Sequence, residues 1–164
     1  MLYLLDANVL IDANRDYYPL DRVPEFWEWL EFQGVSDNIK VPLEVYEEVT
    51  AGNDALAEHF KEPDTKDSLL LEEEVDITLV QMVTEVGYAS NLTEDEIEKI
   101  GRDPFLIAYG LADNVNRWIV TTEGSRPNKK RANRHIPDIC SSLGIESCNT
   151  FKLLRELDFK TKWR

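Results

Sequence analysis

The sequence lacks several features that would assign it to a specialised class of protein. No apolar run approaches the roughly 20 residues that a membrane span needs, and the amino terminus has no basic region typical of a signal peptide. Only two cysteines occur, Cys140 and Cys148, too few for a disulfide framework. We therefore expect a cytoplasmic protein without membrane association. The length of 164 residues predicts a single domain, residues 1–164, with one core.

Recognisable zinc sites and phosphate loops are also absent. His59 and His135 lie far apart, and the two cysteines are not in a Cys-x-x-Cys arrangement, so no ligand spacing typical of zinc is present. No glycine-rich phosphate loop and no Ser/His/Asp pattern is recognisable. The chemistry of this chain must therefore be sought in its carboxylates.

Charge is unevenly distributed along the chain. The formal net charge is −14, but 28 of the 32 acidic residues lie within residues 1–125, and residues 126–164 carry a net charge of +6. The basic part begins with RPNKKRANRH (126–135), which could be a solvated loop or a rim that grips phosphates beside an acidic body. Its candidate phosphate-binding residues are Arg126, Lys129, Lys130, Arg131 and Arg134.

Short apolar segments alternate with helical patterns. LYLL (2–5), NIKV (38–41), WIVTT (118–122) and IESC (145–148) are the predicted strands. A proline opens the helix EFWEWLEF, with Gly34 as its stop, and Pro42 precedes the helix LEVYEEVTA. The many aromatic residues of EFWEWLEF predict mostly core positions, with some facing a partner. Alternating strands and helices indicate an α/β fold with a parallel sheet.

The remaining segments give further predictions of secondary structure. Residues 54–60 predict a short helix, residues 62–67 (EPDTKD) a loop, and residues 76–86 a helix with an apolar stripe. Thr93 and Glu96 form a capping box for the next helix. A helix starts at Asp103-Pro104, and Asn149 caps the final one.

Acidic residues stand where the predicted strands end. Asp6 follows LYLL and Glu123 follows WIVTT, so both belong at the carboxyl edge of a parallel sheet, where sites form. Asp103 begins a helix that could start at the same edge. The second helix supplies Glu44, Glu47 and Glu48, of which 44 and 48 share one face. Clustered carboxylates repel one another unless a cation holds them, and oxygen ligands suit Mg²⁺ or Mn²⁺.

Each acid also has an explanation without catalysis. Asp103 could be the N-cap of its helix, and Asp6 could cap a helix that starts near Val9. Glu48 could be an ordinary solvated residue, and Glu123 could simply sit in the turn Glu-Gly-Ser. The joint pattern favours a site, because each acid stands where a strand ends or a helix begins. A magnesium site of this kind predicts hydrolysis of phosphodiester bonds.

Three motifs resemble those of the PIN domains. LYLLDANVLID resembles the opening strand of that family with its first acid, and VYEEVTAG resembles the second-helix motif that carries the second acid. RDPFLIAYGLADNVNRWIVTTE is similar to the third block, which ends in Thr-x-Asp. The resemblance covers most of the chain in order and spacing. It implies a Rossmann-like α/β/α sandwich with a central, mostly parallel sheet, and it implies an Mg²⁺- or Mn²⁺-dependent endoribonuclease.

The resemblance also implies roles for individual residues. Asp6 and Asp103 match the first and third metal carboxylates, and Glu48 matches the second, with Glu44 or Glu47 as alternatives in another helix register. Glu123 stands where the family commonly has Asp, and its longer side chain could reach the metal differently or through water. The residues that match the polar positions expected to orient the metal ligands are Asn8 and Thr121.

The resemblance points further to the toxins of toxin–antitoxin pairs, which are VapC-type ribonucleases. It therefore implies RNA as the substrate, an antitoxin protein as a partner and a possible homodimer. Two other functions remain open. Asp6 could be the nucleophile of a phosphatase similar to the haloacid dehalogenases, although Asn8 stands where that family has Asp. The chain could instead be a non-catalytic PIN-like module that binds a partner through the aromatic-rich residues 17–32.

Overall fold

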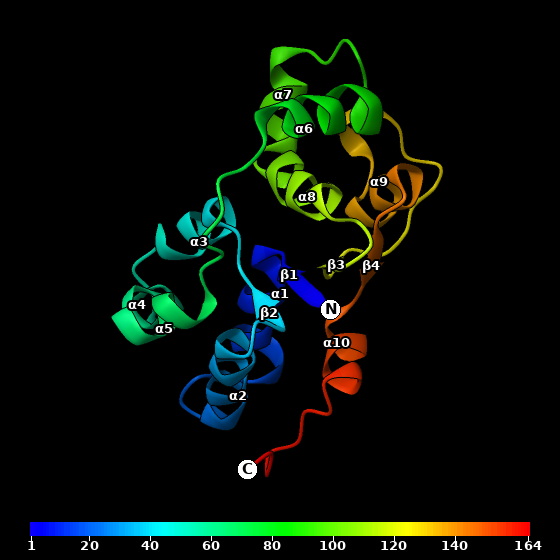
Figure 1. Cartoon of the computed structure of the whole chain (residues 1–164). Helices are drawn as coiled ribbons and strands as arrows, with labels where there is room; N and C mark the ends of the chain where they lie inside the picture. Colours follow the sequence, from blue (N-terminus) through cyan, green and yellow to red (C-terminus); the bar gives the residue numbers. More distant parts are fainter.

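A computed structural model describes all residues, 1–164, and has an α/β fold (Figure 1). Four strands form one sheet, β1 (Leu2–Leu5), β2 (Ile39–Lys40), β3 (Arg117–Val120) and β4 (Glu146–Cys148). All neighbouring strands run parallel, in the order β2-β1-β3-β4. The predicted α/β fold with a parallel sheet is confirmed. The strand β1 matches LYLL, β2 and β4 are shorter than NIKV and IESC, and β3 begins one residue before WIVTT and ends at Val120.

Ten α-helices and three other helical segments surround the sheet. They are α1 (Ala7–Asp12), η1 (Ala13–Tyr17), α2 (Pro24–Val35), α3 (Leu43–Thr50), α4 (Ala55–Lys61), α5 (Pro63–Leu69), α6 (Ile77–Met82), η2 (Val83–Tyr88), α7 (Glu94–Ile100), α8 (Asp103–Ala112), η3 (Arg131–Asn133), α9 (Ile136–Leu143) and α10 (Thr150–Glu156). Figure 1 shows α8 and α9 on one side of the sheet and α1, α2 and α10 on the other. This arrangement is the Rossmann-like α/β/α sandwich that the motif resemblance implies.

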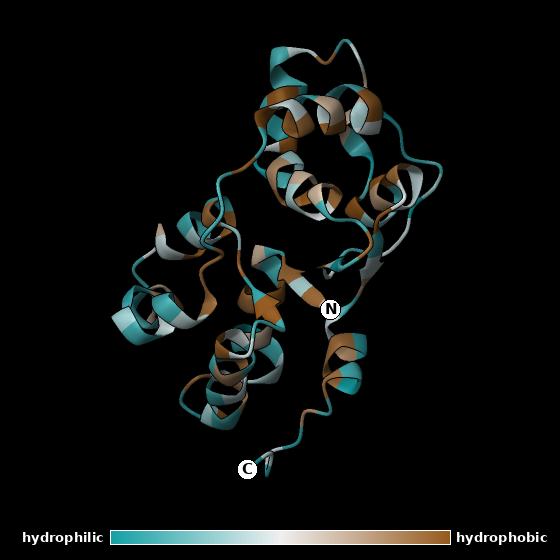
Figure 2. Cartoon of the chain, in the orientation of Figure 1, coloured by the Kyte–Doolittle hydropathy of each residue, from teal (hydrophilic) through white to brown (hydrophobic).

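The hydrophobic core lies around the central strands. Figure 2 shows hydrophobic residues along β1 and also on the helices that surround the sheet. Helix α2 contributes three almost fully buried aromatic side chains, Phe26, Trp27 and Trp29. Phe32 of the same helix is half exposed. The expectation that most aromatic residues of this helix belong to the core is therefore confirmed, and Phe32 is the one that faces outward.

Several predicted helix ends carry the expected caps. Thr93 and Glu96 make both hydrogen bonds of a capping box at the start of α7. The side chain of Asn149 accepts a hydrogen bond of 2.9 Å from the backbone N–H of Lys152 in α10. These contacts satisfy amide groups that would otherwise be unpaired at helix starts. Local sequence signals therefore place both helices correctly.

Two predictions about α2 and α5 are wrong. Residues 62–67, predicted as a loop, belong largely to α5, which starts at Pro63 and buries Thr65 and Leu69. Gly34 does not stop α2, because the helix continues to Val35. A Cβ atom at Gly34 would lie 2.5 Å from the carbonyl oxygen of Ser68, so glycine is needed there for the close approach of α5. Packing between the two helices thus explains both errors.

The helix predicted over residues 76–86 differs in its last turns. It begins as α6 and continues as the π-helical segment η2, which ends at Tyr88. The predicted apolar stripe is not a continuous core face, since Ile77 is 65% exposed, Val86 is 64% exposed, and only Val83 of the stripe is fully buried. The wider π turn changes the direction in which the following side chains point. No helix in the structure is both long and apolar enough to cross a membrane.

Candidate functional site

The acidic residues gather where the order of the strands reverses. The chain passes from β1 to β2 on one side of the sheet, whereas β3 and β4 lie on the other side of β1. In open parallel sheets, ligands bind beyond the carboxyl ends of the strands at such a point. Leu5 pairs with Val120, so the residues that follow them, Asp6 and Thr121, stand side by side at this edge.

Asp6 is a buried carboxylate with one side-chain partner. Its side chain is 6% exposed, and Thr121 Oγ1 donates a hydrogen bond of 2.9 Å to its Oδ2. The backbone N–H of Glu123 donates in turn to Thr121 Oγ1 at 3.2 Å. Asp6 stands at the N-cap position of α1 but makes no capping hydrogen bond with its side chain. The explanation of Asp6 as a side-chain cap is therefore wrong.

Burial raises the pKa of Asp6 to about 6. The hydrogen bond from Thr121 acts in the opposite direction, and the charges of Glu123 and Glu48 raise the pKa further. Asp6 therefore sits in a place where its negative charge is unfavourable. A cation among these carboxylates would reverse that situation, because an opposite charge nearby favours the ionised form.

Asp103 is the first residue of α8, and its side chain makes no hydrogen bond. The N-cap position belongs to Arg102, so the explanation of Asp103 as the N-cap is wrong. Burial, followed by the charges of Asp6, Glu123 and Glu48, raises the pKa of Asp103 to about 7. The four acids thus influence one another although they come from separate parts of the chain.

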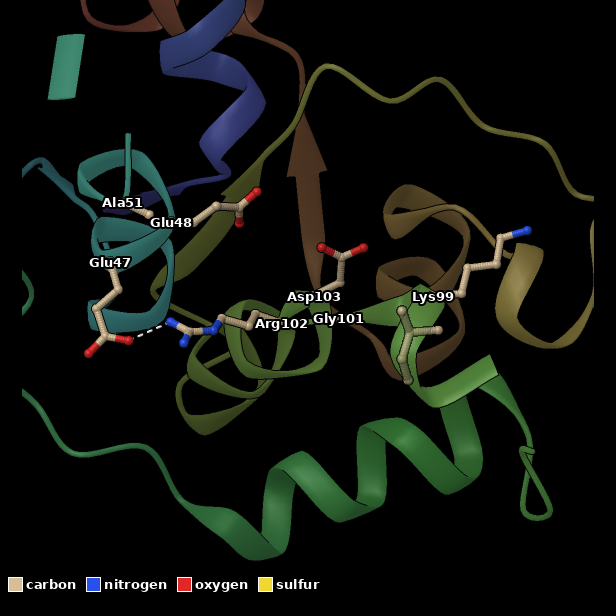
Figure 3. Close-up of a pocket in the computed structure, with 8 residues that line it drawn as sticks. Glu47, Glu48, Ala51, Lys99, Gly101, Arg102 and Asp103 are labelled. Carbon is tan, nitrogen blue, oxygen red and sulfur yellow. Dashed lines mark hydrogen bonds and ion pairs between the residues drawn. The ribbon is translucent and has the colours of Figure 1, made fainter. Parts of the chain in front are cut away.

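The three acids of α3 point in different directions. Figure 3 shows Glu48 and Asp103 extending into the same space between α3 and α8, whereas Glu47 turns away and pairs with Arg102. Burial and then the charge of Glu44 raise the pKa of Tyr109, which places Glu44 beside that phenol. Among the three, only Glu48 contributes to the raised pKa values at the centre of the site.

Glu123 has a contact that the sequence does not predict. Its Oε2 accepts a hydrogen bond of 2.7 Å from the backbone N–H of Ile136, the first residue of α9. Glu123 therefore holds the start of α9 as well as facing Asp6 and Asp103. The extra methylene of Glu, compared with Asp, lets the carboxylate reach this amide. Its Oε1 makes no hydrogen bond, which leaves one oxygen for a ligand.

Asn8 does not orient Asp6 in this structure. Its side chain is exposed, whereas Thr121 provides the only side-chain hydrogen bond to the Asp6 carboxylate. Residues two apart on a helix do not face each other, and Asn8 is two residues after Asp6 at the start of α1. Of the two residues expected to orient Asp6, only Thr121 makes the contact.

The donor set of this site fits a hard cation held largely through water. No three Asp, Glu, His or Cys side chains are arranged to hold a metal ion directly. The carboxylates provide only oxygen ligands, and like charges keep such groups apart when no cation lies between them. Mg²⁺ commonly keeps several waters and binds one or two carboxylates. An ion of this type therefore fits the chemistry of the acids.

The basic segment contains two kinds of residue. Arg126, Lys129 and Lys130 are exposed. Arg131, in contrast, pairs with Glu96 through two hydrogen bonds of 2.8 Å. Its guanidinium therefore anchors η3 to α7 and is not free to bind a phosphate. The sequence alone could not reveal this ion pair, because Glu96 lies 35 residues before Arg131.

Arg134 is also held within the protein, although it borders the site. Its guanidinium donates hydrogen bonds to the carbonyl oxygens of Gly87 and Asp138. It lines a cavity of about 250 Å³ together with Asp103 and Glu123. Its charge is thus fixed at the wall of the acidic site.

Several residues at the site escaped the sequence analysis. An open cleft of about 460 Å³ between α3 and α8 is lined by Glu48 and Asp103 and also by Lys99 and Arg102 (Figure 3). Gly101 has a φ of 52°, which lets the chain pass from α7 to α8 within two residues. The two positive residues that precede Asp103 in the sequence are the signal that could have identified them.

Comparison with known proteins places the chain in a family. No curated protein and no solved structure matches it. The model of one family, described as a domain of unknown function (DUF4411), matches residues 3–161. This match spans the sheet, the four acids and the basic segment. The chain therefore belongs to the DUF4411 family.

Proposed function

We propose that this protein is a PIN-like, divalent-metal-dependent endoribonuclease. One observation carries the proposal. Asp6 and Asp103 lie at the edge of the sheet where the strand order reverses, and the pKa of each carboxyl is raised. Neither side chain caps a helix. Folding gains nothing from gathering these charges, so we assign them to a bound cation.

The metal would lie among Asp6, Glu48, Asp103 and Glu123, which would hold it partly through its bound waters. When bound, Mg²⁺ or Mn²⁺ supplies charge neutralisation and a water of lowered pKa for phosphodiester hydrolysis. Thr121 fixes the orientation of the Asp6 carboxylate. Oε1 of Glu123 has no hydrogen-bond partner and is left for the metal or its waters, while Oε2 accepts the hydrogen bond from the start of α9.

The basic segment supports a polyanionic substrate. Lys129 and Lys130 are exposed, and Lys129 lines the cavity beside Asp103 and Glu123. Together with Arg126 they provide a positive rim next to an acidic centre, which suits a phosphate backbone that approaches a metal. The rim also explains how a chain of net charge −14 can engage RNA.

The proposal is tested by cleavage of a mixed RNA pool by the purified protein with Mn²⁺, with Mg²⁺ and with EDTA. We expect cleavage with either metal, none with EDTA, and none with Asp6→Asn or Asp103→Asn. A matched control is Asp21→Asn, an exposed acid outside the site, which should cleave as the wild type does. Equal cleavage by all four proteins, or by the wild type in EDTA, would contradict the proposal.

The proposal includes a restraining partner, on the strength of the motif resemblance, and a cytoplasmic location, on the strength of the low cysteine content. An antitoxin would place a basic side chain among the carboxylates and mimic the charge of the metal. Such a partner should inhibit cleavage by the wild type and should bind Asp6→Asn more weakly. Homodimerisation is proposed on the same basis, and light scattering of the purified protein tests it.

A further inference from the structure

Tyr88 carries a buried hydroxyl group without a partner. The residue is 7% exposed, and its Oη makes no hydrogen bond. It is the last residue of η2, a π-helical segment, and such segments are frequent at functional sites. At Gly87, a Cβ atom would lie 2.8 Å from Ile139 Cγ2, so η2 packs closely against α9 and has little freedom to turn Tyr88 elsewhere.

An unpaired buried hydroxyl is unfavourable for folding. It loses its hydrogen bonds to water and gains none in return. A phenylalanine at position 88 would pack the same ring without this cost. The hydroxyl therefore points to a partner that the protein itself does not supply.

The hydroxyl group faces the acidic centre. A tyrosine phenol is protonated near neutral pH, so the Tyr88 hydroxyl can act as a hydrogen-bond donor. Tyr88, Asp103 and Glu123 all line the cavity of about 250 Å³ described above. A water molecule takes about 30 Å³ of liquid volume, so this cavity has room for a larger ligand.

Positive and hydrogen-bonding groups form the other walls of this cavity. They come from Lys99, Lys129, Arg134 and His135. The cation of Arg134 is held in place by two backbone carbonyls. Nδ1 of His135 lies 2.7 Å from the carbonyl oxygen of Gly124 and must carry the hydrogen, because a carbonyl only accepts. Nε2 of the neutral ring is then an acceptor, so His135 is not one of the donors of this cavity.

We infer that this cavity is a binding subsite for one phosphate group, in which the Tyr88 hydroxyl donates a hydrogen bond to a phosphate oxygen and Lys99 and Arg134 provide the positive charge. A phosphate is the ligand that this combination fits, since it offers several acceptor oxygens and a negative charge. The phenol is a neutral donor, so it completes the subsite without adding a charge next to Asp103. The assignment of the bound phosphate to an RNA strand rests on the proposed function.

The test compares Tyr88→Phe with Tyr46→Phe. Both residues are buried tyrosines, but the hydroxyl of Tyr46 donates a hydrogen bond to the carbonyl of Phe60, away from the acidic centre. Inorganic phosphate is titrated calorimetrically into each full-length protein in excess Mg²⁺, and thermal unfolding is measured without phosphate. Lys99→Gln serves as a second variant on another wall of the cavity.

We expect Tyr88→Phe to bind phosphate roughly 10- to 100-fold more weakly than the wild type, the range for a hydrogen bond to a charged group. Its melting temperature should be unchanged or higher. Tyr46→Phe should bind phosphate normally and melt at a lower temperature, because the carbonyl of Phe60 loses its donor. Lys99→Gln should also weaken phosphate binding. Unchanged affinity in Tyr88→Phe, or no phosphate binding by the wild type, overturns the subsite.

Cleavage of mixed RNA by the same proteins separates this inference from the proposed function. Reduced phosphate affinity and reduced cleavage in Tyr88→Phe would assign the subsite to the RNA strand. Reduced phosphate affinity without RNA cleavage by any protein would retain the subsite for free phosphate and overturn the nuclease. Metal-dependent cleavage with unchanged behaviour of Tyr88→Phe would retain the nuclease and overturn the subsite.

Discussion

Thr121 Oγ1 donates a hydrogen bond of 2.9 Å to Asp6 Oδ2 and joins the carboxyl ends of β1 and β3. Both residues are almost fully buried, at 1% and 6% exposure. Thr121 follows the strand directly, and the same oxygen accepts from the N–H of Glu123. A single hydroxyl group therefore orients the carboxylate of Asp6 and also holds the backbone at Glu123.

The Thr121 contact gives the first prediction. Thr121→Val keeps the shape of the side chain but leaves Asp6 Oδ2 buried without its donor. We expect the pKa of Asp6 to rise further above 6 and the free energy of unfolding to fall by about 1–3 kcal/mol. Cleavage should fall roughly 10- to 100-fold, as when an orienting partner of a metal ligand is lost. Urea unfolding measures the change in stability, and cleavage kinetics measure the change in activity.

Thr122→Val is the control for that substitution. Thr122 is exposed and makes no side-chain hydrogen bond, so its replacement should change neither unfolding nor cleavage. Equal loss of cleavage in Thr121→Val and Thr122→Val would show that the loss comes from a disturbed loop after β3 and not from the missing hydrogen bond to Asp6.

The raised pKa of Asp103 predicts how stability depends on pH without metal. The carboxyl titrates near 3.8 in the unfolded chain and near 7 in the folded protein, so the folded state binds more protons between these values. The free energy of unfolding should therefore fall as the pH rises from about 4 to about 7. The variant Asp103→Asn should show a smaller fall, and its free energy of unfolding should exceed that of the wild type by on the order of 2 kcal/mol at high pH. Urea unfolding in EDTA across this range is the measurement.

Metal should reverse that dependence. A divalent cation binds the ionised carboxylates, so its stabilising effect should be larger above pH 7 than near pH 5. A metal-induced shift in melting temperature of equal size at both pH values would count against Asp103 as a ligand.

Substitution of two neighbouring glutamates on α3 tests which of them is the second metal carboxylate. Glu48 faces Asp6 and Asp103, whereas Glu47 pairs with Arg102 (Figure 3). We expect Glu48→Gln to lower the affinity for Mn²⁺ by roughly tenfold or more, and Glu47→Gln to leave it nearly unchanged. Calorimetric titration of both variants measures this difference. The opposite order of affinities would transfer the role to Glu47.

Two adjacent basic residues of the basic segment should behave differently. Lys130 is exposed and without a partner, so Lys130→Ala should weaken RNA binding and reduce the slope of log affinity against log salt by about 1. Arg131 is bound to Glu96 and Asn91, so Arg131→Ala should instead lower the melting temperature. Filter binding on Asp6→Asn backgrounds, which should not cleave, and thermal unfolding separate the two effects. A loss of salt dependence only in Arg131→Ala would contradict these roles.

Features that depend on short-range patterns could be predicted from the sequence. The strand LYLL, the capping box of Thr93 and Glu96 and the cap by Asn149 each follow from residues within a few positions of one another. The arrangement of Asp6 and Glu123 at one edge followed from the rule that parallel strands share their carboxyl ends. These predictions needed no knowledge of distant contacts.

The errors come from contacts between segments far apart in the sequence. The polar stretch at 62–67 becomes helix α5 because it packs against α2, where Gly34 allows the close approach. The pairing of Arg131 with Glu96 and the contact of Glu123 with the start of α9 likewise depend on tertiary structure. The unpartnered hydroxyl of Tyr88 leaves no trace in the sequence, since only the folded chain shows that nothing bonds to it.

The central claim is that the carboxylates with raised pKa values are the ligands of a divalent cation. Calorimetric titration of Mn²⁺ near pH 6.5, in two buffers of different ionisation enthalpy, tests it most directly because it counts the protons released. We predict binding with proton release by the wild type, since Asp6 and Asp103 must ionise to bind metal, and weaker binding with less proton release by Asp103→Asn. No binding by the wild type, or equal affinity and equal proton release in the two proteins, would contradict the account.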